Sequence, residues 1–309
     1  MPPRTGPIHT ARRGLRARLL PGVLHGVRAL LSRLPWSAVQ RLGWGLGRLG
    51  WWVSRRDRER SLAHLALAFP ELSDNERRRL ARACLRHQGM NLTECLHLLG
   101  RDPREVERHV TVEGWDEVEA LRRAGRPIVL LTAHVGNWEL LGPVVNARGL
   151  QLWAVVRGLD EEGLQEMLIR LRRHFGSKII ERGGPGAARR LLQALRGREG
   201  DRALCMLIDQ DTKVEGVWVP FFGRPAFTPV GAAKIALRQD AAVVPAFLER
   251  LDDGSHVARF HPPLDLPDDE TEATASMTAA IEKQIRRRPE QWVWMHRRWR
   301  RQPEERVLG

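Results

Sequence analysis

The feature of this sequence that most constrains its fold is a series of short apolar runs that alternate with helical patterns. The runs are rich in Val, Ile and Leu, and they cover residues 128–132, 152–156, 178–180, 203–208 and 243–248. Helical patterns at residues 161–175 and 187–198 separate some of them. Buried strands that alternate with helices are typical of parallel sheets. The sequence therefore predicts an α/β fold with a mostly parallel central sheet flanked by helices, and residues 256–260 are expected to add an edge strand.

The chain before this region has a different character. An apolar stripe recurs there at helical spacing, at Leu42, Leu46, Leu49 and Val53. A second, flat face carries Gly43, Gly47 and Gly50. The stripe is flanked by Arg41, Arg48, Arg55, Trp44 and Trp51. An apolar stripe between Arg and Trp side chains is typical of a helix that lies in the plane of a membrane interface. The alternative is a surface helix that docks on its own domain.

Neither a spanning helix nor a signal peptide is predicted. A membrane-spanning helix needs about 20 mostly apolar residues, and arginines interrupt every such window near the N-terminus, at Arg18, Arg28, Arg33, Arg41 and Arg48. A signal peptide would need an apolar core and a small-residue cleavage site. We therefore expect residues 1–60 to form an N-terminal membrane-associated helical segment, and residues 61–309 to form the main domain. Ser73 and Glu76 have the spacing of a capping box at a helix start.

The charge balance points to phosphate-bearing or acidic partners. The chain has 51 Lys and Arg against 37 Asp and Glu, a net charge of +14. Such a charge attracts nucleic acid, anionic lipid or an acidic carrier protein. The basic residues are scattered and no nucleic-acid-binding motif is present, so nucleic acid is not expected as a partner. The three cysteines have no paired spacing, which indicates a reducing compartment and predicts no metal site.

The residues best placed for chemistry follow the apolar run at 128–132. His134 comes directly after this run, and the carboxyl ends of strands are where α/β sheets bind ligands. Asn137 is expected to cap a helix whose first turn contains Glu139, so that the carboxylate orients the imidazole and makes it more basic. The catalytic residues are predicted to be His134 and Glu139. No nucleophile elbow is present, so His134 is expected to activate an external hydroxyl. A structural His at a strand end is the alternative, and a zinc site of the HExxH kind is excluded because no second His is near.

Three segments together resemble a known family. HVGNWE, residues 134–139, matches the His-x4-Asp/Glu motif of glycerolipid-type acyltransferases. Residues 208–231 and 289–303 are similar to two further segments of the bacterial lipid A late acyltransferases, the lauroyl and myristoyl transferases. The resemblance covers roughly residues 15–303.

This resemblance implies a direct acyl transfer. His134, held by Glu139, would deprotonate a hydroxyl of a lipid A precursor, which attacks the thioester of acyl-acyl carrier protein or acyl-CoA, with no cofactor and no covalent enzyme intermediate. Backbone N–H groups after His134 and the Arg157 side chain are candidates to stabilise the oxyanion. Arg157 is also expected to meet acceptor phosphate. The expected substrate-binding residues are Asn137, Arg157, Asp209 and Gln210, although Asp209 has a plain structural pairing as its alternative.

Two further segments, residues 221–229 and 292–300, are expected to lie near the active face or in the core. Residues 221–229 are interpreted as an apolar loop and a helix start, which would line an acyl channel or pack in the core. The Trp- and Arg-rich residues 292–300 are expected to be a structural segment near the active face.

Three other functions stay open. They are transfer to another lipid acceptor (a lysophospholipid, a phosphatidylinositol mannoside or an aminolipid), a non-catalytic membrane scaffold, and a basic nucleic-acid-binding protein. The expected partners are anionic membrane lipid, a lipid A precursor and acyl carrier protein, at the cytoplasmic face of the bacterial inner membrane. The carrier protein is preferred to CoA as donor because it is acidic and the chain is basic.

Overall fold

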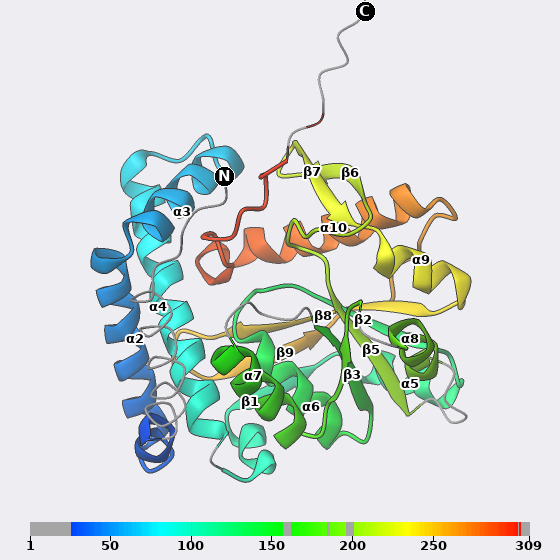
Figure 1. Cartoon of the computed structure of the whole chain (residues 1–309), viewed down its shortest axis with the longest axis horizontal. Helices are drawn as coiled ribbons and strands as arrows, with labels where there is room; N and C mark the ends of the chain where they lie inside the picture. Colours follow the sequence, from blue (N-terminus) through cyan, green and yellow to red (C-terminus); the bar gives the residue numbers. More distant parts are fainter. Residues whose placement is uncertain are drawn as a thin grey trace, which may run out of the picture.

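A computed structural model describes residues 26–99, 101–156, 162–183, 186–195, 201–301 and 303. Seven strands form one central sheet in the order β1-β9-β8-β2-β5-β3-β4 (Figure 1). The strands are β1 (Val110–Glu113), β2 (Ile128–Thr132), β3 (Gln151–Val156), β4 (Lys178–Glu181), β5 (Arg202–Leu207), β8 (Ala242–Arg250) and β9 (His256–Phe260). All neighbours run parallel except β8 and β9. The expectation of a mostly parallel sheet is confirmed.

One strand prediction is corrected. Residues 256–260 form a strand, β9, but it does not lie at the edge of the sheet, because β1 pairs with its outer side in the register Val110↔His256. β1 has four residues and alternates buried and more exposed side chains. So short a run has no distinctive apolar pattern, and for this reason the sequence did not reveal it.

Helices cover both faces of the sheet, and alternate residues of each strand enter one of two cores. On β2, Val129 and Leu131 pack into the core that also contains residues of α9 (Gly231–Arg238) and α10 (Glu270–Arg287), whereas Ile128 and Leu130 pack into the core with α6 (Leu141–Ala147). All five residues of β2 are buried, as a central parallel strand requires. The remaining helices are α2 (Trp36–Val53), α3 (Arg55–Ala68), α4 (Asp74–Leu98), α5 (Trp115–Arg123), α7 (Glu162–His174) and α8 (Ala187–Leu195), with short 3-10 turns η1 (Pro103–Arg108), η2 (Trp138–Leu140) and η3 (Pro289–Gln291). The capping box at Ser73 and Glu76 is confirmed at the start of α4.

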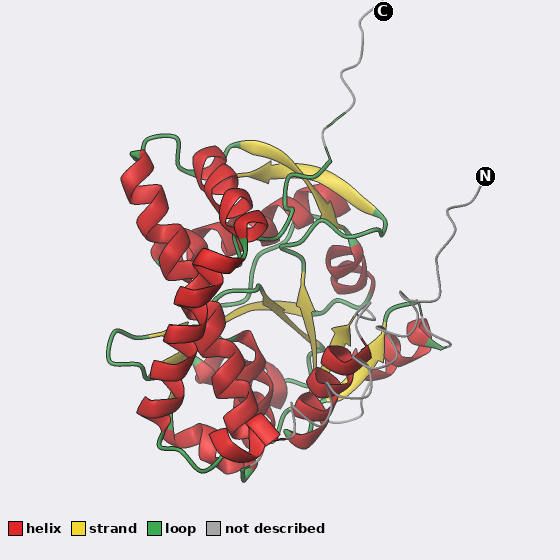
Figure 2. Cartoon of the chain, turned by 60° about the vertical axis from the view of Figure 1, so that its left-hand side comes forward, coloured by secondary structure: helices red, strands yellow, loops and turns green. Residues whose placement is uncertain are grey.

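α2 and α4 lie side by side along one flank of the molecule (Figures 1 and 2). They pack through Gly43 and Gly47 of the glycine face of α2, whereas a Cβ on Gly50 would have nothing within 4 Å. A Cβ on Gly43 would lie 2.5 Å from the Cα of Met90, and one on Gly47 would lie 2.2 Å from the carbonyl oxygen of Leu85. Only glycine allows the two backbones to approach so closely. The alternative given for this helix, docking on its own domain, therefore occurs, and it occurs through the glycines and not through the leucines.

As a consequence, the leucine stripe of α2 faces away from the protein. Leu42, Leu46 and Leu49 are 51%, 44% and 57% exposed, and Val53 is 74% exposed. None of the helices in the described ranges is both long and apolar enough to cross a membrane. Residue 60, the boundary expected between the N-terminal segment and the main domain, falls inside α3.

A second correction concerns residues 221–229. They belong to an antiparallel hairpin of β6 (Gly216–Phe221) and β7 (Arg224–Pro229), and not to a loop and a helix start. Phe222 and Gly223 form its two-residue turn, with φ of 52° and 68°. Two positive φ values match the twist of a tight hairpin. The hairpin lies over α10, and α9 starts at Gly231, directly after it (Figure 1).

Candidate active site

The order of the strands brings His134 and Asp209 together. β2 and β5 are parallel neighbours in the register Thr132↔Leu207, so the residues that follow them meet at the same edge of the sheet. His134 lies two residues beyond the end of β2, and Asp209 lies two residues beyond the end of β5. The Nδ1 atom of His134 is 2.9 Å from Oδ1 of Asp209. The backbone N–H of His134 donates to Oδ2 of the same carboxylate at 3.0 Å.

The Asp209 carboxylate is ionised, and both of its oxygens accept hydrogen bonds. Its side chain is completely buried, and Trp292 donates its indole N–H to Oδ2 at 2.8 Å. Burial alone would raise the pKa of this carboxyl, but His134 and the N–H groups that it accepts from hold its pKa well below the ordinary value. An ionised carboxylate cannot donate, so Nδ1 of His134 carries the proton and donates to Asp209. Nε2 is then the basic nitrogen, on a side chain that is 22% exposed.

The expected pairing of His134 with Glu139 is corrected. Glu139 lies in the 3-10 turn η2, and its carboxylate, 8% exposed, accepts two hydrogen bonds from Arg172 of α7 at 2.7 and 2.9 Å. It also accepts from the indole of Trp138 at 3.1 Å. The Trp138 ring in turn packs edge-on against the imidazole of His134, with centroids 4.9 Å apart. Glu139 therefore reaches His134 only through Trp138, because the chain turns sharply at Gly136 and no regular helix starts there.

Asn137 does not have its expected place either. It makes no side-chain cap at η2 and is 1% exposed, so it cannot meet a substrate. Its amide donates instead to Oε2 of Glu94 at 2.8 Å. Glu94 of α4 also accepts from Arg250 at 2.7 Å and from Gln40 at 2.8 Å. Burial would raise the pKa of the Glu94 carboxyl, but Arg250 and His256 hold it well below its usual range.

This buried network fixes the loop behind His134. Asn91 of α4 donates to the carbonyl oxygen of Gly136 at 2.6 Å. Gly136 has φ of 60°, and a Cβ there would lie 1.7 Å from the carbonyl oxygen of Leu248. The backbone path after His134 therefore requires glycine at position 136 and a hydrogen-bonded Asn at position 137. Gly136 and Asn137 can be identified in the sequence, but the residues of α4 and β8 that they contact come from distant segments of the chain.

The other expected site residues are Asp209, Gln210 and Arg157. Asp209 was expected to bind substrate, but its carboxylate is buried under His134 and Trp292. Gln210 is half-buried beside it, and its side chain makes no hydrogen bond with any residue that the structure describes. Arg157 lies outside the described residues.

Two backbone donors proposed for an oxyanion are already in use. The N–H of Val135 donates to the carbonyl of Ala133, and that of Gly136 donates to the carbonyl of Gln291. Of the groups expected to stabilise the oxyanion, these two are therefore not available. Within the described ranges, no group of three His, Cys, Asp or Glu side chains is placed to hold a metal ion.

The C-terminal segment packs against the site, as expected. Trp292 holds Asp209, and Val135 forms an isolated bridge with Trp292. Farther along, Arg300 and Arg301 form ion pairs with Asp211 at 3.0 and 3.4 Å. Residues 292–301 therefore cover the loop that carries Asp209 and keep water from it. The sequence motif predicted the place of this segment, but it did not show that its first Trp donates to the carboxylate of Asp209.

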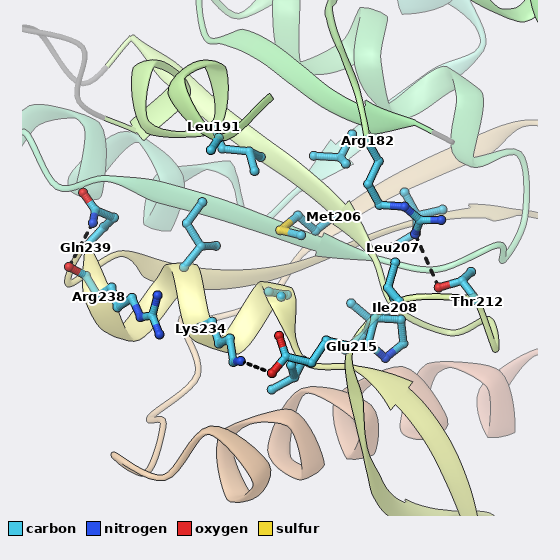
Figure 3. A pocket seen from close by; sticks show the side chains of 18 of the residues that line it. Arg182, Leu191, Met206, Leu207, Ile208, Thr212, Glu215, Lys234, Arg238 and Gln239 are labelled. Atoms are coloured by element: carbon cyan, nitrogen blue, oxygen red, sulfur yellow. Dashed lines mark hydrogen bonds and ion pairs between the residues drawn. The ribbon is translucent and has the colours of Figure 1, made fainter. Parts of the chain in front are cut away.

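A cavity of about 470 Å³ is lined by residues of α8, α9, β3 and β5 (Figure 3). Ile208, which precedes Asp209, is one of its lining residues. Most of the others are apolar, among them Val155 of β3, Met206 of β5, Leu191 of α8 and Ile235 of α9. Polar side chains also line it, including Arg182, Thr212, Glu215 and Lys234. Ligand pockets are commonly about 300–1,000 Å³ and mostly apolar, with a few polar groups.

The family model for bacterial lipid A biosynthesis acyltransferases matches residues 20–301, which is most of the chain. The chain belongs to this family. It is 27% identical to the lipid A biosynthesis lauroyltransferase of Escherichia coli (strain K12) over 294 residues, 90% of each chain. It is 28% identical to the lipid A biosynthesis palmitoleoyltransferase of the same organism over 284 residues, again 90% of each. A phosphatidylinositol mannoside acyltransferase of Mycobacterium tuberculosis (strain CDC 1551 / Oshkosh) is 28% identical over 223 residues, 70% of this chain and 69% of the relative.

Membership of the lipid A biosynthesis acyltransferase family confirms the resemblance inferred from the three motifs, and it makes the chain an acyltransferase. The motif residues His134 and Glu139 lie in one loop of this acyltransferase, as their spacing requires. The loop contacts four partners that local spacing does not reveal, which are Asp209, Trp292, Arg172 and Glu94.

Proposed function

We propose that this acyltransferase moves a fatty acyl group from acyl-acyl carrier protein to a hydroxyl of a lipid A precursor, with His134 as general base. The observation that carries the proposal is the His134–Asp209 dyad at the carboxyl edge of the sheet, with Nε2 as the basic nitrogen. A buried, ionised Asp that holds Nδ1–H keeps the imidazole in the tautomer and orientation that a base needs. It also stabilises the imidazolium that forms when the base takes a proton.

In the proposed reaction, Nε2 of His134 removes the proton of the acceptor hydroxyl as its oxygen attacks the thioester carbonyl. The tetrahedral intermediate then collapses, the C–S bond breaks, and the imidazolium returns the proton to the leaving thiolate. No enzyme nucleophile takes part. The acyl group passes directly from sulfur to oxygen, and His134 is restored in its neutral form.

This cavity is proposed to hold the acyl chain. Its lining by Leu191, Met206 and Ile235 suits a hydrocarbon, since each buried methylene contributes about 0.8 kcal/mol. Ile208 of the lining precedes Asp209 in the chain, and the proposal places the thioester at this end of the cavity.

Glu139 is proposed to be a positioning residue. Its two hydrogen bonds with Arg172 fix η2 against α7, and its bond with Trp138 fixes the ring that packs on His134. Removing one partner of a buried ion pair costs about 3–5 kcal/mol, because the other charge stays buried and unpaired. The expected role of Glu139 is therefore to maintain the site, and the charge beside His134 comes from Asp209.

The donor is proposed to be acyl carrier protein and not CoA. A net charge of +14 attracts a small acidic protein over a long range. The ratio kcat/KM for the carrier-bound donor should therefore fall as salt rises from low to physiological concentration, and it should fall less for acyl-CoA. A preference for acyl-CoA without any salt dependence would contradict this assignment.

The site of action is proposed to be the cytoplasmic face of the inner membrane, with α2 in the interface. The exposed stripe of Leu42, Leu46, Leu49 and Val53 supports this, because a soluble helix seldom leaves such a row uncovered. Trp44 and Trp52, 39% and 69% exposed, flank the stripe. Indole rings favour the level of the lipid headgroups.

The acceptor is tested with the purified full chain, acyl carrier proteins loaded with chains of several lengths, and the tetra-acylated lipid A precursor. The product should gain the mass of one acyl chain. His134→Ala should lower the rate by about 10²–10⁴ while the circular dichroism spectrum stays that of the folded protein. Near-normal turnover by this variant would refute the proposed role of His134.

A second acceptor is favoured by one finding, the similarity to phosphatidylinositol mannoside acyltransferases. The same assay therefore includes a phosphatidylinositol mannoside and a lysophospholipid. Acylation of either one, with no mass gain on the lipid A precursor, would replace the proposed acceptor and leave the acyl transfer and its dyad in place.

A further inference from the structure

A basic hollow lies on the flank formed by α2 and α4, away from the dyad. It has a volume of about 280 Å³ and is lined by Arg48, Trp51, Trp52, Arg82 and Arg86. The arginines stack on indole rings. Arg82 lies 5.0 Å from the ring centre of Trp51, and Arg86 lies 4.7 Å from that of Trp44. Stacking on an indole fixes a guanidinium and leaves its N–H groups free to bind an anion.

Among the described residues, no acidic side chain pairs with the three arginines. None of Arg48, Arg82 and Arg86 forms an ion pair or a hydrogen bond with any residue in the described part of the chain. Other arginines nearby are paired, such as Arg55 with Glu59 and Arg77 with Asp74. Three positive charges held around one hollow repel one another, so an anion that enters it lowers the energy of the folded protein. A phosphate suits the site because it accepts bidentate hydrogen bonds from guanidinium groups.

The surroundings of the hollow identify the source of the phosphate. Trp52, which lines the hollow, is 69% exposed, and the neighbouring Leu49 and Val53 belong to the exposed apolar stripe of α2. A ligand here would therefore meet a basic hollow and an apolar surface together. A phospholipid in a bilayer presents both, with its phosphate at the headgroup level and its chains below.

We propose that Arg48, Arg82 and Arg86 form a binding site for the phosphate of an anionic phospholipid, which anchors α2 and α4 to the membrane. The proposal rests on the proposed location of the enzyme at a membrane surface. It adds a specific lipid contact, separate from the acceptor that reacts at His134. A phospholipid bound here would turn the α2–α4 flank of the molecule toward the membrane.

The test is the binding of the full chain to vesicles that contain phosphatidylglycerol in phosphatidylcholine, compared with vesicles of phosphatidylcholine alone. The double variant Arg82→Gln, Arg86→Gln should lose about 25-fold in partition to the anionic vesicles, about fivefold for each arginine. Its partition to phosphatidylcholine vesicles should not change. The control for net charge is Arg123→Gln, Arg126→Gln, which removes the same number of charges at and just after the end of α5, from ion pairs with Glu119 and Asp240. α5 lies on the other side of Figure 1 from α2 and α4. The control should lose less than twofold.

Four outcomes would overturn the site. An equal loss in the control would assign the effect to net charge. Equal loss of binding to both kinds of vesicle would show that the arginines do not distinguish an anionic phospholipid from phosphatidylcholine, whose phosphate is balanced by choline. Unchanged vesicle binding with a raised KM for acyl carrier protein would assign the hollow to the carrier. Millimolar inorganic phosphate should not release the protein, since free phosphate lacks the acyl chains. Release by phosphate alone would also overturn a lipid site.

Turnover in detergent micelles separates this proposal from the proposed function. The double variant should retain full activity there, because the dyad is intact. If the native chain transfers no acyl group but shows the vesicle preference, the enzymatic proposal fails and the lipid site stands.

Discussion

Among single residues, Asp209 is the one that holds His134 in place. It accepts the Nδ1–H and the backbone N–H of His134 and the indole N–H of Trp292. Asp209→Asn keeps the size of the side chain but removes its charge, and its amide cannot accept all three bonds. We expect kcat to fall by about 10²–10⁴, as for other dyads whose imidazole loses its orienting carboxylate, with KM for either substrate little changed.

Steady-state kinetics on Asp209→Asn and Asp211→Asn check this. Asp211 is also buried and lies in the same loop, but it pairs with Arg300 and Arg301. Its variant should lose less than tenfold in kcat. Equal losses in the two variants would mean that the loop needs its carboxylates for folding and not for chemistry.

Leu191 gives a second prediction for a single residue. It extends from α8 toward the cavity, opposite α9 (Figure 3). Leu191→Trp should fill part of the cavity and shift the preferred acyl chain to a shorter one, whereas Leu191→Ala should allow a longer one. One methylene in an apolar pocket is worth about 1–3 kcal/mol, or about 10–200-fold in kcat/KM. Competition between acyl carrier proteins of different chain length, read by mass spectrometry, measures the shift. Identical preferences in both variants would show that the chain binds elsewhere.

At the level of elements, the packing of α2 on α4 depends on backbone contact between glycines. Gly47→Ala would place a Cβ 2.2 Å from the carbonyl oxygen of Leu85, so the helices must separate. Gly45 lies on the same helix, but a Cβ there has nothing within 4 Å. Gly45→Ala should therefore raise the free energy of unfolding by up to about 1 kcal/mol through helix propensity alone. Gly47→Ala should lower it by about 1–3 kcal/mol, as overpacking does.

Denaturant titration of the two alanine variants measures both effects in the same element. The signs should be opposite. A Gly47→Ala protein as stable as Gly45→Ala would mean that α2 does not pack closely on α4 in solution.

For the whole molecule, buried histidines make stability depend on pH. Burial and then the charge of Arg250 lower the pKa of His87 to about 3, and burial lowers the pKa of His296 to about 4. Both side chains therefore stay neutral in the folded protein just below pH 6.5. In the unfolded chain the same side chains take up protons there. A histidine in the unfolded chain has a pKa of about 6.5. The free energy of unfolding is therefore highest above this pH and falls as the pH drops below it. Each of the two should lower the free energy of unfolding by about 1.4 kcal/mol between pH 7.5 and 5.5.

The free energies of unfolding from urea titrations at the two pH values should thus differ by about 2.8 kcal/mol because of these two groups. His87→Gln removes one of the two groups and should reduce the difference. A midpoint that does not move between pH 7.5 and 5.5 would show that these histidines are charged in the folded protein.

Local patterns in the sequence were sufficient for the parts of this protein in which near neighbours interact. The apolar run at 128–132 became β2 with the same ends, and the capping box started α4, because strand burial and helix caps depend on residues a few positions apart. The position of His134 at the carboxyl end of a parallel strand followed from the same run. The family was also evident from the motifs, and its model matches most of the chain.

Only the tertiary structure decided which side chains meet. Asp209 is 75 residues from His134, and it becomes its partner because β5 inserts between β2 and β3 in the sheet. No local spacing contains that order, and for this reason the nearby Glu139 looked like the partner. In the same way, the periodicity of α2 showed a leucine stripe and a glycine face, but it could not tell which one faces the protein. Backbone approach to Gly89 of α4 required the glycines, so the leucines were left exposed.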